Sequence, residues 1–269
     1  MDTPGVGGQL AAAITAASVA ELAWIDPVGR PSAVPVVPLL LADQPAVALP
    51  YAFAELAGRV GAAPRAALVL SDPRMTGRGW RPLAATATPR LVVDDDGSLF
   101  AAQLMDQELR KYPPARALVG SPLLRREHWW YLPRLVLLLG NTVAADVGAR
   151  HGERQALLVS GATSQPATSP EVDTVQVEDW DAERVALGSL SGRPVPTDGR
   201  PSLLMGHDFS VPDLERWSWH HTYGRLGSDG LTVDSRPASR ALEPVPGLFL
   251  RIRRQRALER RCRRALSRR

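Results

Sequence analysis

The sequence of 269 residues predicts a mainly β protein with helical insertions. Short apolar runs recur along the first 250 residues, and most of them end in clusters of Pro, Gly, Asp and Ser, which favour turns between strands. Three longer stretches have helical composition instead. With 45% hydrophobic and 22% charged residues, the chain has the composition of a folded soluble protein, which excludes a wholly disordered one.

The N-terminal segment predicts a helix followed by a hairpin. Residues 9–20 are Ala-rich and predict a short helix. The apolar stretch after them is interrupted at residues 26–31 by Asp-Pro-Val-Gly-Arg-Pro, in which Pro presets φ and Gly permits a positive φ. We therefore expect a hairpin over residues 20–41. Two prolines in its second arm cannot donate to a ladder and favour an edge or bulged strand. Residues 45–49 predict a further short strand.

The rest of this half alternates between helical and strand patterns. Residues 51–62 have helical composition and end before a proline. Residues 65–70 predict a buried strand, and residues 80–93 predict a long β region closed by an Asp/Gly turn. Residues 99–112 predict a helix that two prolines end. Residues 129–139 predict the last strand of this half.

The chain divides into four regions by composition. Residues 1–140 form the first domain. Residues 161–170 are rich in Gly, Ser, Thr and Pro, so we assign residues 141–172 to a linker. Residues 173–250 contain short strand candidates separated by Gly, Pro and Asp, and form a smaller β-rich segment. Residues 251–269 form an Arg-rich C-terminal helix.

The charge of the chain is unevenly distributed. Residues 251–269 carry ten arginines and one glutamate, so this segment has a formal charge of +9, and the first 250 residues have −5. The sequence pI of about 9.8 therefore describes the tail. Lys111 is the only lysine in the sequence.

Several classes of protein are excluded by missing motifs. The lone Cys262 excludes a disulfide framework, and no CxxC pair occurs for a zinc site. No G-x-S-x-G elbow or P-loop occurs. No unbroken apolar run, residues 135–139 included, approaches the roughly 20 residues that span a bilayer. No Lys or Arg precedes the Ala-rich N-terminal stretch, so we expect no secretory signal and a cytoplasmic protein.

Three segments carry a family resemblance: residues 23–31, residues 34–37, and residues 64–70 with the sequence Pro-Arg-Ala-Ala-Leu-Val-Leu. Their order and spacing within residues 9–140 resemble the FMN-binding split barrel. This is the superfamily of pyridoxamine 5′-phosphate oxidase-like proteins and flavin- or deazaflavin-dependent reductases. The resemblance implies a six-stranded antiparallel barrel, usually dimeric, with the cofactor at the subunit interface.

The resemblance also implies a function. It predicts a flavin-type oxidoreductase, with FMN or a deazaflavin, acting on a small organic substrate. The cofactor ring would carry out the redox chemistry while the protein orients it, so we expect no catalytic acid or base from the chain. The alternative is a non-catalytic split-barrel protein that binds a ligand, haem among them, or a partner.

In proteins of this superfamily the helix before the P-R-x-A-L strand commonly presents Lys and Arg to the cofactor phosphate. Here that helix, residues 53–60, has Leu56 where the lysine is expected. Arg59 and Arg65 remain as candidates for neutralising a phosphate. This departure leaves FMN, a deazaflavin, haem and no cofactor as alternatives.

Four further residues complete the predicted cofactor site. Ser71, at the end of a strand, is expected to donate a hydrogen bond to a phosphate or ring oxygen, although Ser-Asp-Pro also opens ordinary turns. Trp80 offers a stacking surface for the ring, with core packing as its alternative role. The resemblance places Val36 and Val37 along the ring through their backbone groups.

Two other clusters permit a functional and a structural interpretation. Residues 125–131, Arg-Arg-Glu-His-Trp-Trp-Tyr, are expected to form either a wall for a planar ligand or, preferentially, a strand at a dimer interface, where Trp, Tyr and Arg are enriched. His220 and His221 are adjacent and point to opposite faces of a strand, so we expect no metal site there.

A short repeat bears on the oligomeric state. The sequence Gly-Arg-Pro-Ser at residues 29–32 recurs at residues 199–202, either by chance or because residues 173–250 form a degenerate second barrel half. The expected assembly is accordingly a homodimer or an intrachain pseudo-dimer.

The tail has an amphipathic pattern. Leu258, Cys262, Ala265 and Leu266 form an apolar stripe on an arginine-rich helix. Such a helix either docks on its own acidic body, which we favour, or associates with nucleic acid or an anionic membrane.

Overall fold

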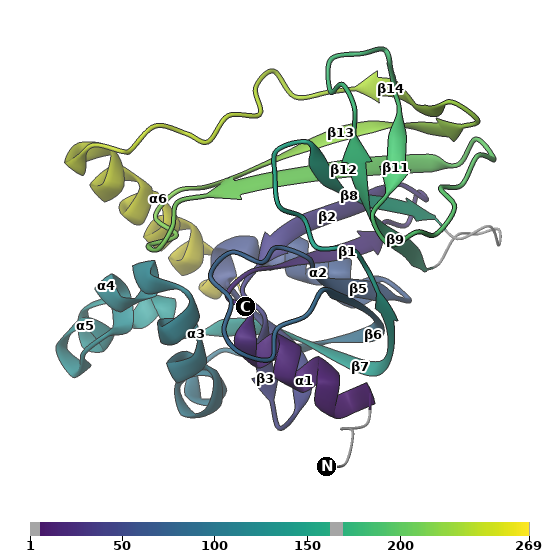
Figure 1. Cartoon of the computed structure of the whole chain (residues 1–269). Helices are drawn as coiled ribbons and strands as arrows, with labels where there is room; N and C mark the ends of the chain where they lie inside the picture. Colours follow the sequence, from purple (N-terminus) through teal and green to yellow (C-terminus); the bar gives the residue numbers. More distant parts are fainter. Residues whose placement is uncertain (1–5, 162–168, 269) are drawn as a thin grey trace.

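The chain folds into two seven-stranded antiparallel sheets, as seen in a computed structural model that describes residues 6–161 and 169–268. In Figure 1 the second sheet lies above the first, and most helices lie along one side of the pair. The predicted mainly β class with helical insertions is confirmed.

The first sheet curls into a nearly closed barrel. Its strand order is β2-β1-β5-β6-β7-β4-β3. The edge strands β2 and β3 are separated in the chain by residues 37 and 38 alone, so the two edges of the sheet must lie close together. The strands are β1 (Ala20–Ile25), β2 (Pro31–Val36), β3 (Leu39–Leu41), β4 (Gln44–Pro50), β5 (Ala66–Leu70), β6 (Leu83–Asp94) and β7 (Arg134–Asp146).

Alternation along the strands assigns one face of this sheet to the barrel interior. In β5, Leu68 and Leu70 point into a core that α1 and α2 also line, whereas Ala67 and Val69 point outward to the second sheet. The outward face is thus as buried as the inward one. The helices are α1 (Val6–Ala16), α2 (Ala54–Ala62), α3 (Met105–Lys111), α4 (Arg116–Val119), α5 (Pro122–Glu127) and α6 (Leu248–Leu266).

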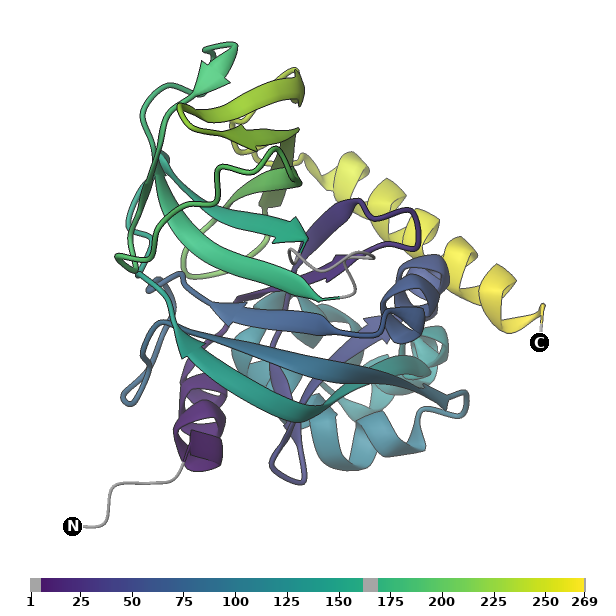
Figure 2. The same cartoon turned by 90° about the vertical axis from the view of Figure 1, so that its right-hand side faces the viewer.

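The second sheet covers the outer face of β1, β2 and β5. Its order is β10-β14-β13-β12-β8-β9-β11. Small residues of the first sheet pack against larger ones of the second: Ala23 and Ala67 against Leu157, Leu203 and Met205. Figure 2 shows the second sheet lying over the first. The strands are β8 (Gln155–Gly161), β9 (Pro170–Val177), β10 (Arg184–Val185), β11 (Leu187–Ser189), β12 (Pro201–Phe209), β13 (Trp217–Gly227) and β14 (Gly230–Ser235).

The second sheet begins earlier in the chain than the sequence pattern indicates. Strand β8 and the first residues of β9 lie within residues 141–172, which we expect to be a linker. Residues 162–168 of that range lie outside the described residues. Strand β7 also extends past residue 140, to Asp146, and forms the path from the barrel to the second sheet.

The prediction of a strand beginning at residue 129 is wrong. Residues 122–127 form α5 and Trp129–Tyr131 form a 3-10 turn, and β7 begins at Arg134. The reason is local: the hydroxyl of Ser121 accepts a hydrogen bond from the Leu124 N–H, and a proline follows at the first helical position. Trp130 and Tyr131 are buried in the core of their own chain.

Candidate functional site

Two of the predicted cofactor residues lie on the surface, away from any described cavity. Arg59, in α2, is exposed and forms an ion pair with Glu55 at 3.0 Å. Arg65 donates a hydrogen bond from Nη1 to Thr88 Oγ1 at 3.1 Å. Both guanidinium groups therefore already have a partner in their own chain.

The other four predicted residues are divided among three places. Val36 is buried in the core of the barrel and Trp80 packs against the same core, whereas Val37 packs against the second core, on the side of α3. Ser71 is fully buried at the end of β5, among charged side chains. The structure therefore does not bring the six predicted residues together around one site.

Ser71 belongs to a group that we call the buried polar cluster, formed by Glu21, Ser71, Arg150 and His207. Glu21 forms an ion pair with Arg150 and lies 2.7 Å from His207 Nε2. Arg150 Nε donates to Ser71 Oγ at 2.8 Å, and Ser71 Oγ donates to Glu21 at 3.3 Å. Trp217 Nε1 donates to His207 Nδ1 at 3.4 Å, and Arg150 Nη2 lies 2.8 Å from His207 Nε2.

The cluster keeps its carboxylate ionised inside the protein. Burial raises the pKa of Glu21, but Arg150 and the hydrogen bond from His207 outweigh that effect, and the pKa lies below its ordinary value. Because Glu21 is in β1 of the first sheet and His207 is in β12 of the second, the same contacts join the two sheets.

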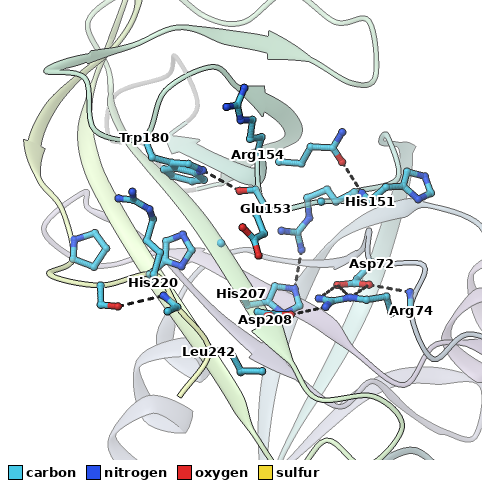
Figure 3. A pocket seen from close by; sticks show the side chains of 18 of the residues that line it. Asp72, Arg74, His151, Glu153, Arg154, Trp180, His207, Asp208, His220 and Leu242 are labelled. Carbon is cyan, nitrogen blue, oxygen red and sulfur yellow. Dashed lines mark hydrogen bonds and ion pairs between the residues drawn. The ribbon is translucent and has the colours of Figure 1, made fainter. Parts of the chain in front are cut away.

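Next to this cluster lies a cavity of about 700 Å³ at the junction of the two halves, which we call the seam cavity. The first half contributes Asp72 and Arg74, which follow β5, and the second half contributes β12, β13 and two loops, residues 151–154 and 237–242. Its volume is within the range of small-molecule sites. Figure 3 shows Trp180 and His220 on one side of the cavity, with Asp72 and Arg74 opposite.

Most charges in the seam cavity are already paired. Arg74 contacts Asp72 at 2.8 Å and Asp208 at 2.5 Å, and Arg240 contacts Asp181 at 2.9 Å. These two arginines and three aspartates make the walls polar with a net charge of only −1.

Glu153 and Arg154 differ from these paired groups. Within residues 6–161 and 169–268, neither side chain forms an ion pair or a hydrogen bond, and the Glu153 carboxylate points into the cavity (Figure 3). The cavity therefore contains one carboxylate that no other described group occupies, while the exposed Arg154 guanidinium lies at its edge and points away from the Glu153 carboxylate (Figure 3).

The inner wall is formed by an indole and an imidazole. Trp180 Nε1 donates to the Glu153 carbonyl at 3.0 Å, and the Trp180 ring meets the His220 ring edge-on at 5.2 Å. The His220 ring lies over Gly206, where a Cβ atom would come within 2.3 Å of it. Only glycine leaves room for this imidazole.

His220 is held in its neutral form. Burial lowers its pKa to about 4, with a further contribution from Arg240. Its Nε2 is buried and has no hydrogen-bond partner among the described residues. This nitrogen packs against Gly206, so the neutral imidazole can ligate a metal ion through it only if the ring turns toward the cavity.

No group of three or more His, Cys, Asp or Glu side chains in the described part of the chain is arranged to hold a metal ion by itself. The helices of the described residues include none that is long and apolar enough to cross a membrane.

No known protein family and no curated protein matches the sequence. Among solved structures, the chain is similar to a heme binding protein from Mycobacterium smegmatis, with 12% identity, a TM-score of 0.36, and 98% of this chain and 100% of that chain covered. A pyridoxamine 5′-phosphate oxidase-related, FMN binding protein from Nostoc punctiforme has 16% identity and a TM-score of 0.33, with 82% and 97% covered. Protein Atu2129 from Agrobacterium tumefaciens has 18% identity and a TM-score of 0.35 over 53% of this chain, which covers 57% of that protein.

These likenesses carry no argument about activity, because the identities are below 25% and the TM-scores below 0.5. The fold assignment depends on the first sheet itself, an antiparallel sheet that curls until its two edge strands lie close together. The split-barrel likeness predicted from residues 9–140 is confirmed at the level of the fold, with seven strands in place of the expected six.

The residues of the seam cavity give weak signals in the sequence. Glu21 is the clearest, because a single carboxylate inside the apolar run Ala-Glu-Leu-Ala-Trp-Ile indicates a buried charge that needs a partner. Arg154 and Trp180 occur in ordinary turn-rich segments. His220 is recognisable only as half of a His-His pair, and its role depends on which face of β13 it occupies.

Proposed function

We propose that this protein binds a planar ring ligand with an acidic substituent in the seam cavity, and that it is a binding protein rather than a flavin reductase. The observation that supports this proposal is the cavity of about 700 Å³ that combines an indole and a neutral imidazole, with the unpaired guanidinium of Arg154 at its edge. Small-molecule sites typically have this mixture of apolar walls and few oriented polar groups.

Haem is the ligand class that the donor set favours. The neutral imidazole of His220 is the form that ligates iron, and Arg154 at the cavity can pair with a carboxylate. Trp180 supplies apolar ring surface in the same wall. Bound haem would supply the iron chemistry, while the chain would hold the ring and exclude water from one of its faces.

A flavin is the weaker candidate. The phosphate of FMN needs cations, yet Arg59 is paired with Glu55 on the surface and Leu56 occupies the position of the expected lysine. A deazaflavin would find the same shortage of unpaired cations. If the seam cavity held a flavin, Arg154 would be the one unpaired arginine of the described lining that could bind the anionic end of the cofactor.

We further propose that the chain is an intrachain pseudo-dimer. The second sheet covers the outer face of β1, β2 and β5, and the seam cavity lies where the two halves meet. In a split-barrel dimer the second subunit would supply such a surface. A monomer in solution would agree with this proposal.

The test is ligand retention by the purified full-length chain. Haem, FMN and a deazaflavin are added separately, and absorbance spectra are recorded after gel filtration. We expect a haem band that remains in the wild type, shifts or is lost in His220→Ala, and is unchanged in His221→Ala, since His221 faces the first sheet. Retention of no ligand would overturn the proposal, and retention of FMN with loss in Arg59→Gln would favour the reductase.

A further inference from the structure

We propose that α6 binds the surface of an anionic phospholipid membrane through the face that points away from the body. One side of α6 packs onto the protein through Leu258, Cys262 and Leu266, and Cys262 is fully buried. Figure 2 shows the helix along one side of the molecule with no other element beyond it. The outer side is therefore free for an external partner.

Four arginines line that outer side. Arg253, Arg256, Arg260 and Arg264 are spaced by three or four residues, which places them on one face over roughly 17 Å of helix. All four are exposed, and none forms an ion pair or a side-chain hydrogen bond with another described residue. We call this row the arginine stripe.

The remaining arginines of the helix behave differently. Arg251 pairs with Glu215 at 2.8 Å, and Arg254 pairs with Glu243 at 2.5 Å. The acidic body thus attracts the arginines on the inner side and leaves the stripe uncompensated. Because the first 250 residues carry −5 and residues 251–269 carry +9, an anionic surface attracts this helix more strongly than the body as a whole.

Apolar side chains at the start of α6 distinguish lipid from nucleic acid. Leu248, Phe249 and Ile252 are 69%, 89% and 40% exposed, and this end of the helix extends beyond the sheets in Figure 1. Phe249 is four residues before Arg253 and shares its face. Helices that lie in a membrane interface combine Leu and Phe with basic residues in this way. Exposed aliphatic side chains gain nothing from a sugar-phosphate backbone, whereas acyl chains can bury them.

The experiment measures co-sedimentation of the full chain with vesicles of phosphatidylcholine containing phosphatidylserine, and with vesicles of phosphatidylcholine alone. We expect binding to the anionic vesicles that weakens with salt. The variant Arg253→Gln/Arg256→Gln should lower the partition coefficient by roughly 30-fold. The matched control Arg251→Gln/Arg254→Gln removes the same charge from the paired side and should lower it clearly less.

A second variant tests the apolar part. Phe249→Ser/Ile252→Ser keeps every charge and should still weaken binding to anionic vesicles several-fold, since it removes apolar surface that the acyl chains would bury. The proposal is overturned if the wild type does not sediment with anionic vesicles, or if the two arginine pairs have equal effects. Binding to duplex DNA that exceeds vesicle binding and does not change in Phe249→Ser/Ile252→Ser would assign the stripe to nucleic acid instead.

Discussion

The buried polar cluster and the seam cavity are adjacent and share His207. Polar side chains have hydrogen-bond partners in the cluster, whereas some in the cavity have none among the described residues. In the cluster, Glu21 accepts hydrogen bonds from three side chains of both halves and has no exposed surface. In the cavity, Arg154 and His220 keep unused hydrogen-bonding capacity. Satisfied polar groups hold the two sheets together, while unsatisfied ones are left for a ligand.

The largest effect is expected from breaking the cluster. Glu21→Ala leaves Arg150 and His207 buried without their acceptor, and removal of one partner of a buried ion pair costs about 3–5 kcal/mol. Urea unfolding of wild type and variant gives the free energy of unfolding. Glu55→Ala breaks an exposed pair and serves as the control with little change. If both variants lost equally little, Glu21 would not join the sheets.

The next largest loss of stability is expected at Gly206, against which the His220 ring packs. Gly206→Ala places a methyl group within 2.3 Å of the His220 ring, and overpacking of this kind costs about 1–3 kcal/mol. The double variant Gly206→Ala/His220→Ala removes the clash and should regain most of that free energy of unfolding. Additive losses in a double-mutant cycle would show that the two residues do not touch.

The sequence predicts the first sheet far better than the second. Residues 20–41 and 65–70 alternate between turn signals and apolar runs, so their strands are visible in the pattern. Strand β13, at Trp217–Gly227, is not predicted, because both of its faces are partly covered and its residues are a mixture of aromatic, charged and small types. Local patterning carries no signal for such a strand.

The seam cavity is still harder to predict. Its lining extends from Asp72 to Leu242, and these segments meet only because the second sheet packs on the first. That packing depends on the match between small residues such as Ala67 and larger ones such as Met205, which is a tertiary property. The resemblance directs attention to Arg59, Arg65 and Trp80 instead, in the part of the fold where its pattern is strongest.

The two sites also differ in how they make the free energy of unfolding depend on pH. The pKa of His220 is lowered to about 4 in the folded state, so between its ordinary value of 6.5 and pH 4 the unfolded chain binds a proton that the folded chain does not. The free energy of unfolding must therefore fall as the pH falls through that window. His220→Gln removes the His220 part of this dependence and leaves that of His221, whose pKa burial also lowers, whereas the Glu21 contribution is lost only below pH 4.5. Equal slopes for wild type and His220→Gln between pH 6.5 and 4 would contradict the assignment.

The smallest effect on stability is expected at Arg154. Its side chain is exposed and has no partner within the described residues, so Arg154→Gln should change the free energy of unfolding by no more than about 0.5 kcal/mol. The same substitution should nevertheless weaken ligand retention, because it removes the unpaired cation of the cavity. Arg184→Gln, which removes an exposed arginine paired with Asp229, is the matched control for net charge and should leave retention unchanged. If Arg154→Gln lost stability but kept ligand retention, Arg154 would have a structural role like that of the buried polar cluster. The contrast between a stabilising cluster and a ligand-binding cavity would then be wrong.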